Sequence, residues 1–306
     1  MDASGVFLFH GWMDLVLSTP ATGDLTEVLR TLADWRREDT PMQLHPGDVG
    51  FHWQLGAQAT ADALRVWRRD GRIVAVGMID GPDVVRLAVE PELHTDGELA
   101  QRMVDDLSQP DRGVLSTERV SVEAMWGGRF RELALDNGWE PDEPWVPLVR
   151  DLAEPVPAGT LRVERVGPDR VADRVAVQRG AFEGSKFTAE RWHTMATGVG
   201  YRNARCIVGY DEHGHAVAAV TVWSAGKGRP GLLEPVGVHR DHRGHGYGTA
   251  IAVAAAAVLR DMGASSATVC TPLDNAAAVA TYRSAGFSER PTVRDLRRPA
   301  LDSVES

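Results

Sequence analysis

The second half of the chain alternates short apolar runs with longer helical patterns. A short apolar run is typical of a buried strand, and a glycine-rich stretch behind it indicates a turn. The alanine-rich run after that turn favours a helix ended by Gly263, and Gly286 ends a second helix. The pattern predicts a hairpin from 204–210 and 215–223, a strand at 232–238, a turn at 239–248, a helix at 249–262, a strand at 267–270 and a helix at 275–284. This series is typical of an α/β layered domain.

The first half repeats this order more weakly. Here the pattern predicts strands at 72–80, 84–89 and 120–124 and helices at 98–107 and 129–136. Gly97 and Gly138 are 41 residues apart, and Gly246 and Gly286 are 40 apart. A shift of 148 to 149 residues brings the two series into register. We therefore expect one fold used twice; the alternative is that two unrelated α/β domains share this spacing.

A candidate linker separates the two halves. Residues 151–160 (DLAEPVPAGT) contain two prolines, one glycine and few apolar side chains. We expect a first domain at 1–152 and a second at 160–306, each of the α/β (α+β) class with a mixed central sheet flanked by helices.

The charge of the chain is divided unevenly between these halves. All 306 residues together have a formal net charge of −10. Residues 1–155 contain 14 arginines, no lysine and 28 acidic residues, which gives −14, and residues 156–306 contain 19 basic and 15 acidic residues, which gives +4. Two units with different partners would explain the asymmetry, and so would drift of surface charge. The acidic total disfavours nucleic acid as a partner, because phosphate binding needs clustered lysine and arginine.

Composition also indicates where the protein works. No run reaches the roughly 18 apolar residues of a transmembrane helix, so we expect no membrane partner. The apolar run at 6–9 has no basic segment before it, which argues against a secretory signal. Cys206 and Cys270 are the two cysteines, so neither a disulfide framework nor a CxxC metal pair exists. We expect a cytoplasmic protein.

The most informative segment is the turn at 243–248 (RGHGYG) between a predicted strand and helix. Glycine permits positive φ and a close approach of ligand to backbone. The free N–H groups at a helix start attract anions, and phosphate is a natural ligand for them. A P-loop would need a lysine after its last glycine, and a Rossmann turn would need glycine at Thr249. The arrangement RxxGxG is present as Arg243, Gly246 and Gly248.

This turn resembles the Q/R-x-x-G-x-G/A motif with which the GNAT superfamily of N-acetyltransferases binds acetyl-CoA. Residues 275–287 resemble the NxxAxxxYxxxGF signature of the same family. The resemblance covers roughly 161–298, with both motifs in the expected strand and helix context. It implies two tandem GNAT-like domains, an arrangement similar to that of mycothiol synthase.

The resemblance also implies which residues hold the co-substrate acetyl-CoA. The turn would bind its pyrophosphate, and the preceding strand would pair with its pantetheine arm. Pro235 and Gly237 weaken β pairing, so we expect that strand to be bulged or splayed. Asn275 would bond the cofactor or cap its helix. The implied cofactor-binding residues are Val236, Gly237, Val238, Arg243, Gly244, His245, Gly246, Tyr247, Gly248, Thr249 and Asn275.

Two residues are candidates for acid–base catalysis. Tyr282 matches the family tyrosine that protonates the departing thiolate, and a tyrosine with a pKa of about 10 can serve as a general acid. Glu234 lies on the strand where family members place a base, but two residues after the usual position, which is Leu232 here. A two-residue shift keeps the same face of a strand. Glu234 could take the amine proton directly or through water, or it could be structural.

We expect no metal site. His239, His242 and His245 form an HxxHxxH run, but the run lies in a loop of a family that needs no metal, so these histidines are expected to be exposed to solvent.

The first half departs from the motif. With the 149-residue shift His94 replaces the motif arginine, and only Gly97 persists among the glycines. With the 148-residue shift Ala134 replaces the tyrosine. Asp96 and Glu98 would repel phosphate. We therefore expect a degenerate copy, retained for structure or for shaping the substrate site, and acetyl-CoA binding in the second half alone.

The leading hypothesis is transfer of acetyl from acetyl-CoA to the primary amine of a small molecule, by direct attack of the amine on the thioester. A cationic acceptor would suit the acidic first half. The alternatives are a non-catalytic acetyl-CoA-binding regulatory module and a protein or peptide acetyltransferase. No sequence pattern selects the acceptor or the oligomeric state.

Overall fold

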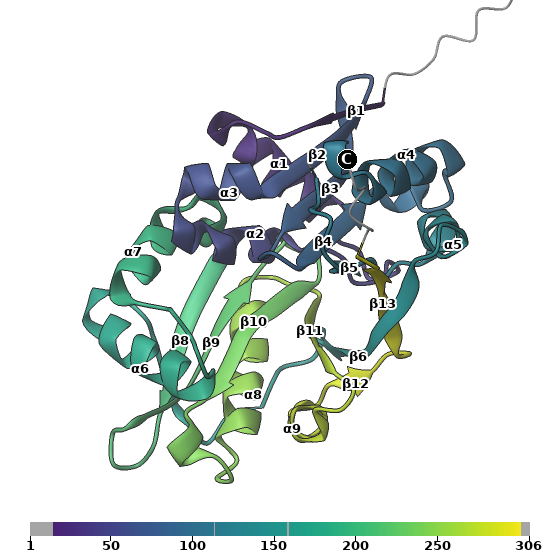
Figure 1. The fold of residues 1–306 in the computed structure, drawn as a ribbon. Helices are drawn as coiled ribbons and strands as arrows, with labels where there is room; N and C mark the ends of the chain where they lie inside the picture. The colour runs from purple at the N-terminus through teal and green to yellow at the C-terminus, as the bar shows by residue number, and fades with distance from the viewer. Residues whose placement is uncertain (1–14, 113, 158, 301–306) are drawn as a thin grey trace, which may run out of the picture.

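The computed structural model describes residues 15–112, 114–157 and 159–300. Within them the chain forms a mixed α/β fold whose strands join into one long sheet (Figure 1). The predicted fold class is confirmed. No helix of the described part is both long and apolar enough to cross a membrane. The apolar run at 6–9, on which the prediction about a secretory signal rests, lies outside the described residues.

The first half contains every element that the pattern predicts there, each within one residue of its expected bounds. Its strands are β1 (Leu15–Ser18), β2 (Leu64–Arg69), β3 (Arg72–Ile79), β4 (Val84–Val89), β5 (Val120–Glu123) and β6 (Glu140–Asp151). Its helices are α1 (Leu25–Asp34), α2 (Pro46–His52), α3 (Ala57–Ala63), α4 (Gly97–Ser108) and α5 (Gly128–Asp136).

The second half likewise contains the predicted hairpin, strands and helices. Its strands are β7 (Arg162–Arg165), β8 (Ala204–Tyr210), β9 (Ala216–Trp223), β10 (Gly231–Val238), β11 (Ser266–Pro272), β12 (Ser288–Glu289) and β13 (Val293–Arg298). Its helices are α6 (Val171–Ala181), α7 (Ala189–Thr197), α8 (Tyr247–Asp261) and α9 (Ala276–Ser284). Helix α8 begins two residues before the predicted start, because Gly246 serves as its N-cap in a left-handed conformation.

The two halves exchange their last strands. The order of the sheet is β1-β2-β3-β4-β5-β13-β6-β11-β10-β9-β8-β7, with β12 beside β6. Strand β6, from the first half, pairs with β11 of the second, and β13 at the end of the second half pairs with β5 of the first. In Figure 1 the yellow β13 lies between β5 and β6. The boundaries at 152 and 160 stay a prediction, and the exchange joins both predicted units in one sheet.

Strand β10 separates from its neighbour β11 soon after it begins. The two parallel strands pair only at Gly231 and Leu232, and the pairing of β10 with β9 shifts register between Leu233 and Val236. Proline cannot donate to a β ladder, so Pro235 lies at the irregularity. The expected bulged and splayed strand is therefore confirmed.

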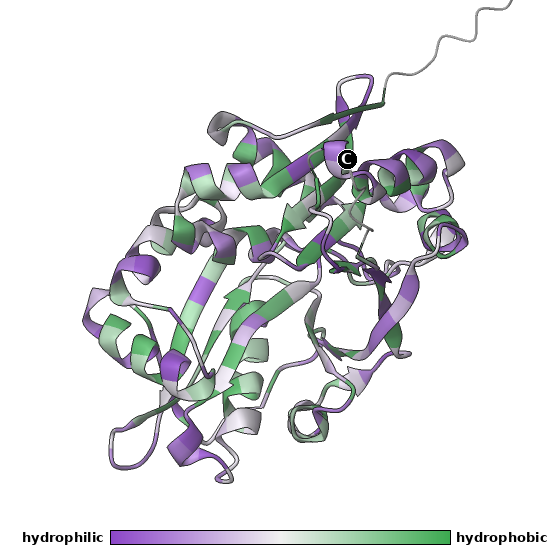
Figure 2. Cartoon of the chain, viewed as in Figure 1, coloured by the Kyte–Doolittle hydropathy of each residue, from purple (hydrophilic) through white to green (hydrophobic). Residues whose placement is uncertain are grey.

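Apolar side chains fill the space between the sheet and its helices. Figure 2 shows hydrophobic segments along the central strands and hydrophilic ones on outward helical surfaces. One core cluster centres on Trp67, and Leu296 from β13 packs into it. Another joins α8 to the sheet and includes Leu148 from β6. Each exchanged strand therefore contributes to the core of the other half.

Candidate functional site

The glycine-rich turn of the second half leads directly into α8. Gly244 and Gly246 have φ angles of 82° and 78°, a left-handed conformation that favours glycine. No described side chain caps α8, and no described residue accepts a hydrogen bond from the backbone amides of residues 244–249. Consecutive free N–H groups at the positive end of a 15-residue helix are a geometry that binds phosphate.

Two arginines fasten this turn to the end of α6. Arg243 Nη2 donates to the carbonyl of Ala181 at 2.9 Å, and Arg240 Nε donates to that of Gly180 at 3.0 Å. A Cβ on Gly180 would lie 1.9 Å from the ring of His239, so only glycine permits this approach. Arg243 is exposed and forms no ion pair with a described residue, which leaves its charge available to an anion.

The residues predicted to follow the cofactor arm lie where β10 leaves β11. Val236, Gly237 and Val238 are half-buried. A Cβ on Gly237 would lie 2.7 Å from Ala181 and 3.0 Å from Phe182, so the β10 backbone runs close to the end of α6. Both predicted parts of the cofactor site, the turn and the splayed strand, therefore adjoin the same end of α6.

Helix α9 packs beside the start of α8. Thr249 Oγ1 lies 3.5 Å from the carbonyl of Thr281, and a Cβ on Gly248 would lie 3.0 Å from Thr281 Cγ2. Asn275 Oδ1 accepts a hydrogen bond from Ala278 N at 3.2 Å, so Asn275 caps α9. Capping was one of the two roles predicted for this residue.

Tyr282 lies on the inner side of α9. Its ring is 8% exposed and meets Phe287 edge to face, with 5.7 Å between ring centroids. Its hydroxyl has no hydrogen bond to a described residue. Burial raises the pKa of Tyr282 well above its usual value, and the charges of Glu234 and Cys270 raise it further. The hydroxyl therefore keeps its proton near neutral pH and lies within electrostatic reach of Glu234.

Glu234 lies on β10 just after the point where this strand separates from β11. Burial raises its pKa to about 7, Asp48 and Asp80 raise it further, and Arg86 opposes them. No described residue forms an ion pair with its carboxylate. Glu234 borders a small inner cavity of about 50 Å³, lined also by Leu232 and Cys270, and a larger outer cavity of about 330 Å³. A carboxyl group with this pKa can exchange a proton near neutral pH.

Sequence reasoning missed the first-half residues that surround Glu234. Arg86 Nε lies 2.8 Å from Asp80 Oδ2, and its Nη1 lies 3.2 Å from Glu123 Oε2 and 4.0 Å from Asp48 Oδ1. The 149-residue shift, which aligns Val89 with Val238 on these strands, places Arg86 on Pro235 rather than on Glu234. No local pattern predicts that Arg86 and Glu234 meet.

The equivalent helix start in the first half is closed by its own side chain. Asp96 caps α4, and its Oδ1 accepts a hydrogen bond from Leu99 N at 2.8 Å. The Oδ2 atom of Asp96 lies 2.6 Å from Arg69 Nη1, and Glu98 lies 3.5 Å from the same guanidinium. An internal carboxylate therefore occupies the position that the second half leaves free.

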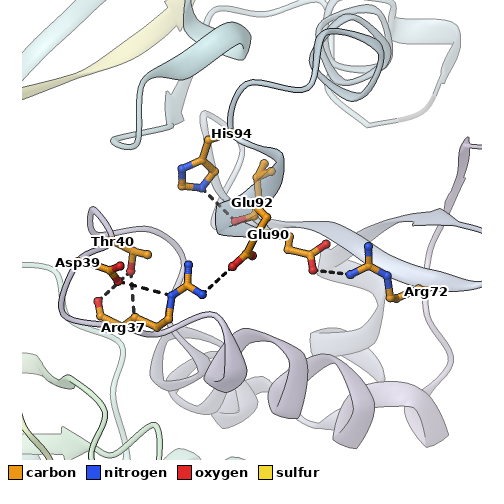
Figure 3. Close-up of polar contacts among 8 residues, drawn as sticks. Arg37, Asp39, Thr40, Arg72, Glu90, Glu92 and His94 are labelled. Atoms are coloured by element: carbon orange, nitrogen blue, oxygen red, sulfur yellow. Dashed lines mark hydrogen bonds and ion pairs between the residues drawn. The ribbon is translucent and has the colours of Figure 1, made fainter.

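Further ion pairs hold the turn before α4. Figure 3 shows Arg37 on Glu92, 2.6 Å apart, and Arg72 on Glu90. His94, which replaces the motif arginine, contacts the carbonyl of Val89 at 3.2 Å. The acidic residues of this turn are thus engaged with arginines of their own half.

The histidines of the second-half turn contact other aromatic rings. The rings of His239 and His242 lie 5.6 Å apart, and His245 stacks on Tyr247 at 5.7 Å. In the described part of the chain, no group of three or more His, Cys, Asp or Glu side chains is arranged to hold a metal ion.

These features have a counterpart among known proteins. Residues 175–287, which span α6 through the end of α9, match the model of the acetyltransferase (GNAT) family. Over this segment the chain is similar to the GNAT acetyltransferase family. The matched segment contains both the glycine-rich turn and Tyr282, and the first half lies outside it.

Solved structures show that the whole chain has the tandem GNAT fold. A tandem GNAT protein from the clavulanic acid biosynthesis pathway, solved without acetyl-CoA, superimposes with a TM-score of 0.61 at 21% identity, over 95% of this chain and 100% of that one. A GCN5-related N-acetyltransferase from Sphaerobacter thermophilus gives 0.54 at 18% identity, over 94% and 98%. A GNAT-family acetyltransferase from Colwellia psychrerythraea gives 0.58 at 15% identity, over 93% and 98%. No curated protein matches the sequence significantly.

Proposed function

We propose that the second half transfers acetyl from acetyl-CoA to the primary amine of a small molecule. The observation that carries this proposal is the combination of uncapped amides at the start of α8 with a splayed β10 that bears Glu234. The first half lacks the free helix start, because Asp96 caps α4. The proposal therefore assigns one acetyl-CoA site to each chain, with a cytoplasmic location indicated by two free cysteines.

The residues present fit acetyl-CoA, which supplies the acetyl thioester. The amides of 244–249 and the unpaired charge of Arg243 suit its pyrophosphate. The open edge of β10 at 236–238 offers backbone groups to the amide-bearing arm. Asn275 uses its Oδ1 to cap α9, so its Nδ2 is the atom left for the cofactor.

The side chains at the splay provide both proton transfers. Glu234 accepts a proton from the substrate ammonium, because its pKa of about 7 makes it a usable base near neutral pH. The freed amine nitrogen bonds to the thioester carbon while the carbon–sulfur bond breaks, and the nitrogen gives its second proton to solvent to become the amide. Tyr282 gives its hydroxyl proton to the leaving sulfur and regains a proton from solvent. Tyr282 is protonated at neutral pH, because burial raises its pKa, so its hydroxyl has a proton to donate.

The size of the outer cavity favours a small molecule over a protein acceptor. About 330 Å³ lies within the range of small-molecule pockets. The walls come from both halves: Asp48 and Asp80 of the first half face Glu234 of the second. Arg86 and Arg191 also line the cavity, but the three carboxylates outnumber them, which favours a cationic amine.

A screen of amines with a thiol reagent tests this function. The full chain is mixed with acetyl-CoA and one amine at a time, and release of the CoA thiol is followed. The proposal expects amine-dependent release with at least one small amine. Binding of acetyl-CoA with no amine-dependent release would instead support the non-catalytic regulatory module.

A further inference from the structure

The inner cavity beside Glu234 is lined by one carboxylate and one guanidinium that form no ion pair with a described residue. Arg36, Gln43, Asp48, Arg86 and Glu123 of the first half and Glu234 of the second line it. Arg86 already pairs with Glu123 at 3.2 Å and lies 4.0 Å from Asp48. Those charges belong to one network, and Glu234 is left without an ion pair in the described part of the chain.

Arg36 is the guanidinium without an ion pair. Its side chain is 2% exposed, and no described carboxylate forms an ion pair with it. Its Nη1 donates only to the carbonyl of Gln43, at 3.3 Å, and its Nε has no partner. Burial lowers the pKa of Arg36 to about 10 although Asp48 and Glu38 oppose the shift, so the group remains charged at neutral pH. A buried Nε without an acceptor is costly, which indicates that an acceptor such as a ligand carboxylate joins it in the working complex.

Gln43 adds a second free donor at the same wall. Its residue is 9% exposed, and its Oε1 accepts a hydrogen bond from Val89 N at 3.1 Å. Its Nε2 has no partner in the described structure. Buried amide donors in proteins are nearly always bonded, so this group also calls for an acceptor.

The cavity is too small for two separate ligands. At about 50 Å³, and with about 10–15 Å³ needed for one water, it holds roughly four water-sized groups. A headgroup in which an ammonium and a carboxylate are attached to one carbon is a compact way to bring both charges into this volume. The outer cavity shares Asp48, Arg86 and Glu234 with the inner one, so it can take the rest of such a molecule.

We propose that the acceptor is an α-amino acid whose ammonium group lies at Glu234 and whose carboxylate lies at Arg36 and Gln43. This inference rests on the proposed acetyl transfer and narrows its acceptor from an amine to an amino carboxylate. It assigns the first half a direct part in substrate binding. The side chain of the amino acid extends into the outer cavity, beside Phe51 and Met78.

Matched pairs of acceptors test this directly. The full chain and acetyl-CoA are assayed for thiol release with phenylalanine against phenethylamine, leucine against isoamylamine, and serine against ethanolamine. Within each pair only the carboxylate differs. We expect a kcat/KM roughly 10- to 100-fold higher for the amino acid in at least one pair, the range for a hydrogen-bonded charged group. Equal or better use of the decarboxylated amine in every pair would overturn the inference and leave acetyl transfer standing, whereas no release with any amine would overturn both.

A near-isosteric variant locates the carboxylate. Gln43→Glu keeps the oxygen that accepts from Val89 N and replaces the free donor with a negative charge. We expect it to raise KM for the amino acid about tenfold or more and to reduce the preference within the pair. The control Gln101→Glu adds the same charge on the exposed face of α4 and should leave both values unchanged. A preference unaltered in Gln43→Glu would contradict the assignment.

Discussion

The starts of α4 and α8 occupy equivalent places in the two copies of the fold but present opposite surfaces to an anion. At α4 the carboxylate of Asp96 bonds the helix amide of Leu99 and pairs with Arg69. At α8 the equivalent position is a glycine with no cap, and the amides stay free. The difference teaches that one side chain is enough to turn a phosphate site into a structural cap, because both ligands use the same N–H groups.

The same contrast appears on the central strands. Arg86 on β4 and Glu234 on β10 are one position out of register under the 149-residue shift that aligns these strands, and in the folded chain they lie in one charge network. The first half, which has no free helix start, therefore still supplies residues that line the inner cavity. We infer that its role is acceptor binding rather than support alone.

The largest expected effect comes from making α8 resemble α4. Gly246→Asp places a carboxylate at the N-cap of α8, where it competes with phosphate and must adopt a φ of 78°. We expect acetyl-CoA binding to be lost in calorimetry. The matched variant Gly97→Asp, at a glycine with open space around it in the first half, should bind normally. Retained binding in Gly246→Asp would place the cofactor elsewhere.

Removal of the proposed acid should have the next largest effect. Tyr282→Phe is expected to lower kcat by about 100-fold or more, the usual range for a lost proton transfer, without changing the Kd of acetyl-CoA. Tyr210→Phe is the control, because the Tyr210 hydroxyl bonds Asp173 away from this site. A kcat that stays at the wild-type value would remove Tyr282 from the mechanism.

The pH dependence of kcat/KM should report the ionisation of Glu234. A base is active when ionised, so kcat/KM should rise with pH and level off above a pKa of about 7. Glu234→Gln should remove this limb and slow turnover at neutral pH. Since Arg86 lowers the pKa of Glu234, Arg86→Met should move the limb to higher pH in any variant that folds. A limb that persists in Glu234→Gln belongs to another group.

The smallest effect is expected at the closed helix start. Asp96→Ala removes the cap of α4 and the partner of Arg69, so it should lower the free energy of unfolding by about 1–2 kcal/mol in urea titrations. Acetyl-CoA affinity should not change. A loss of affinity without a loss of stability would show that α4, rather than α8, binds the cofactor.

Local patterns predicted the elements that position the turn. The alanine-rich run of α8, the glycine stops at Gly263 and Gly286, and the irregular strand around Pro235 all depend on neighbouring residues. The strand exchange could not be predicted, because β6 and β13 are equally able to pair within either half. The inner cavity could not be predicted either, because residues as distant in sequence as Arg36 and Glu234 meet only through tertiary packing.

The number of acetyl-CoA molecules bound per chain tests the contrast between the two helix starts most directly. Calorimetric titration of the full chain should give one site, because Asp96 already occupies the amides of α4 whereas those of α8 are free. A stoichiometry of two, or one site that survives Gly246→Asp, would contradict it.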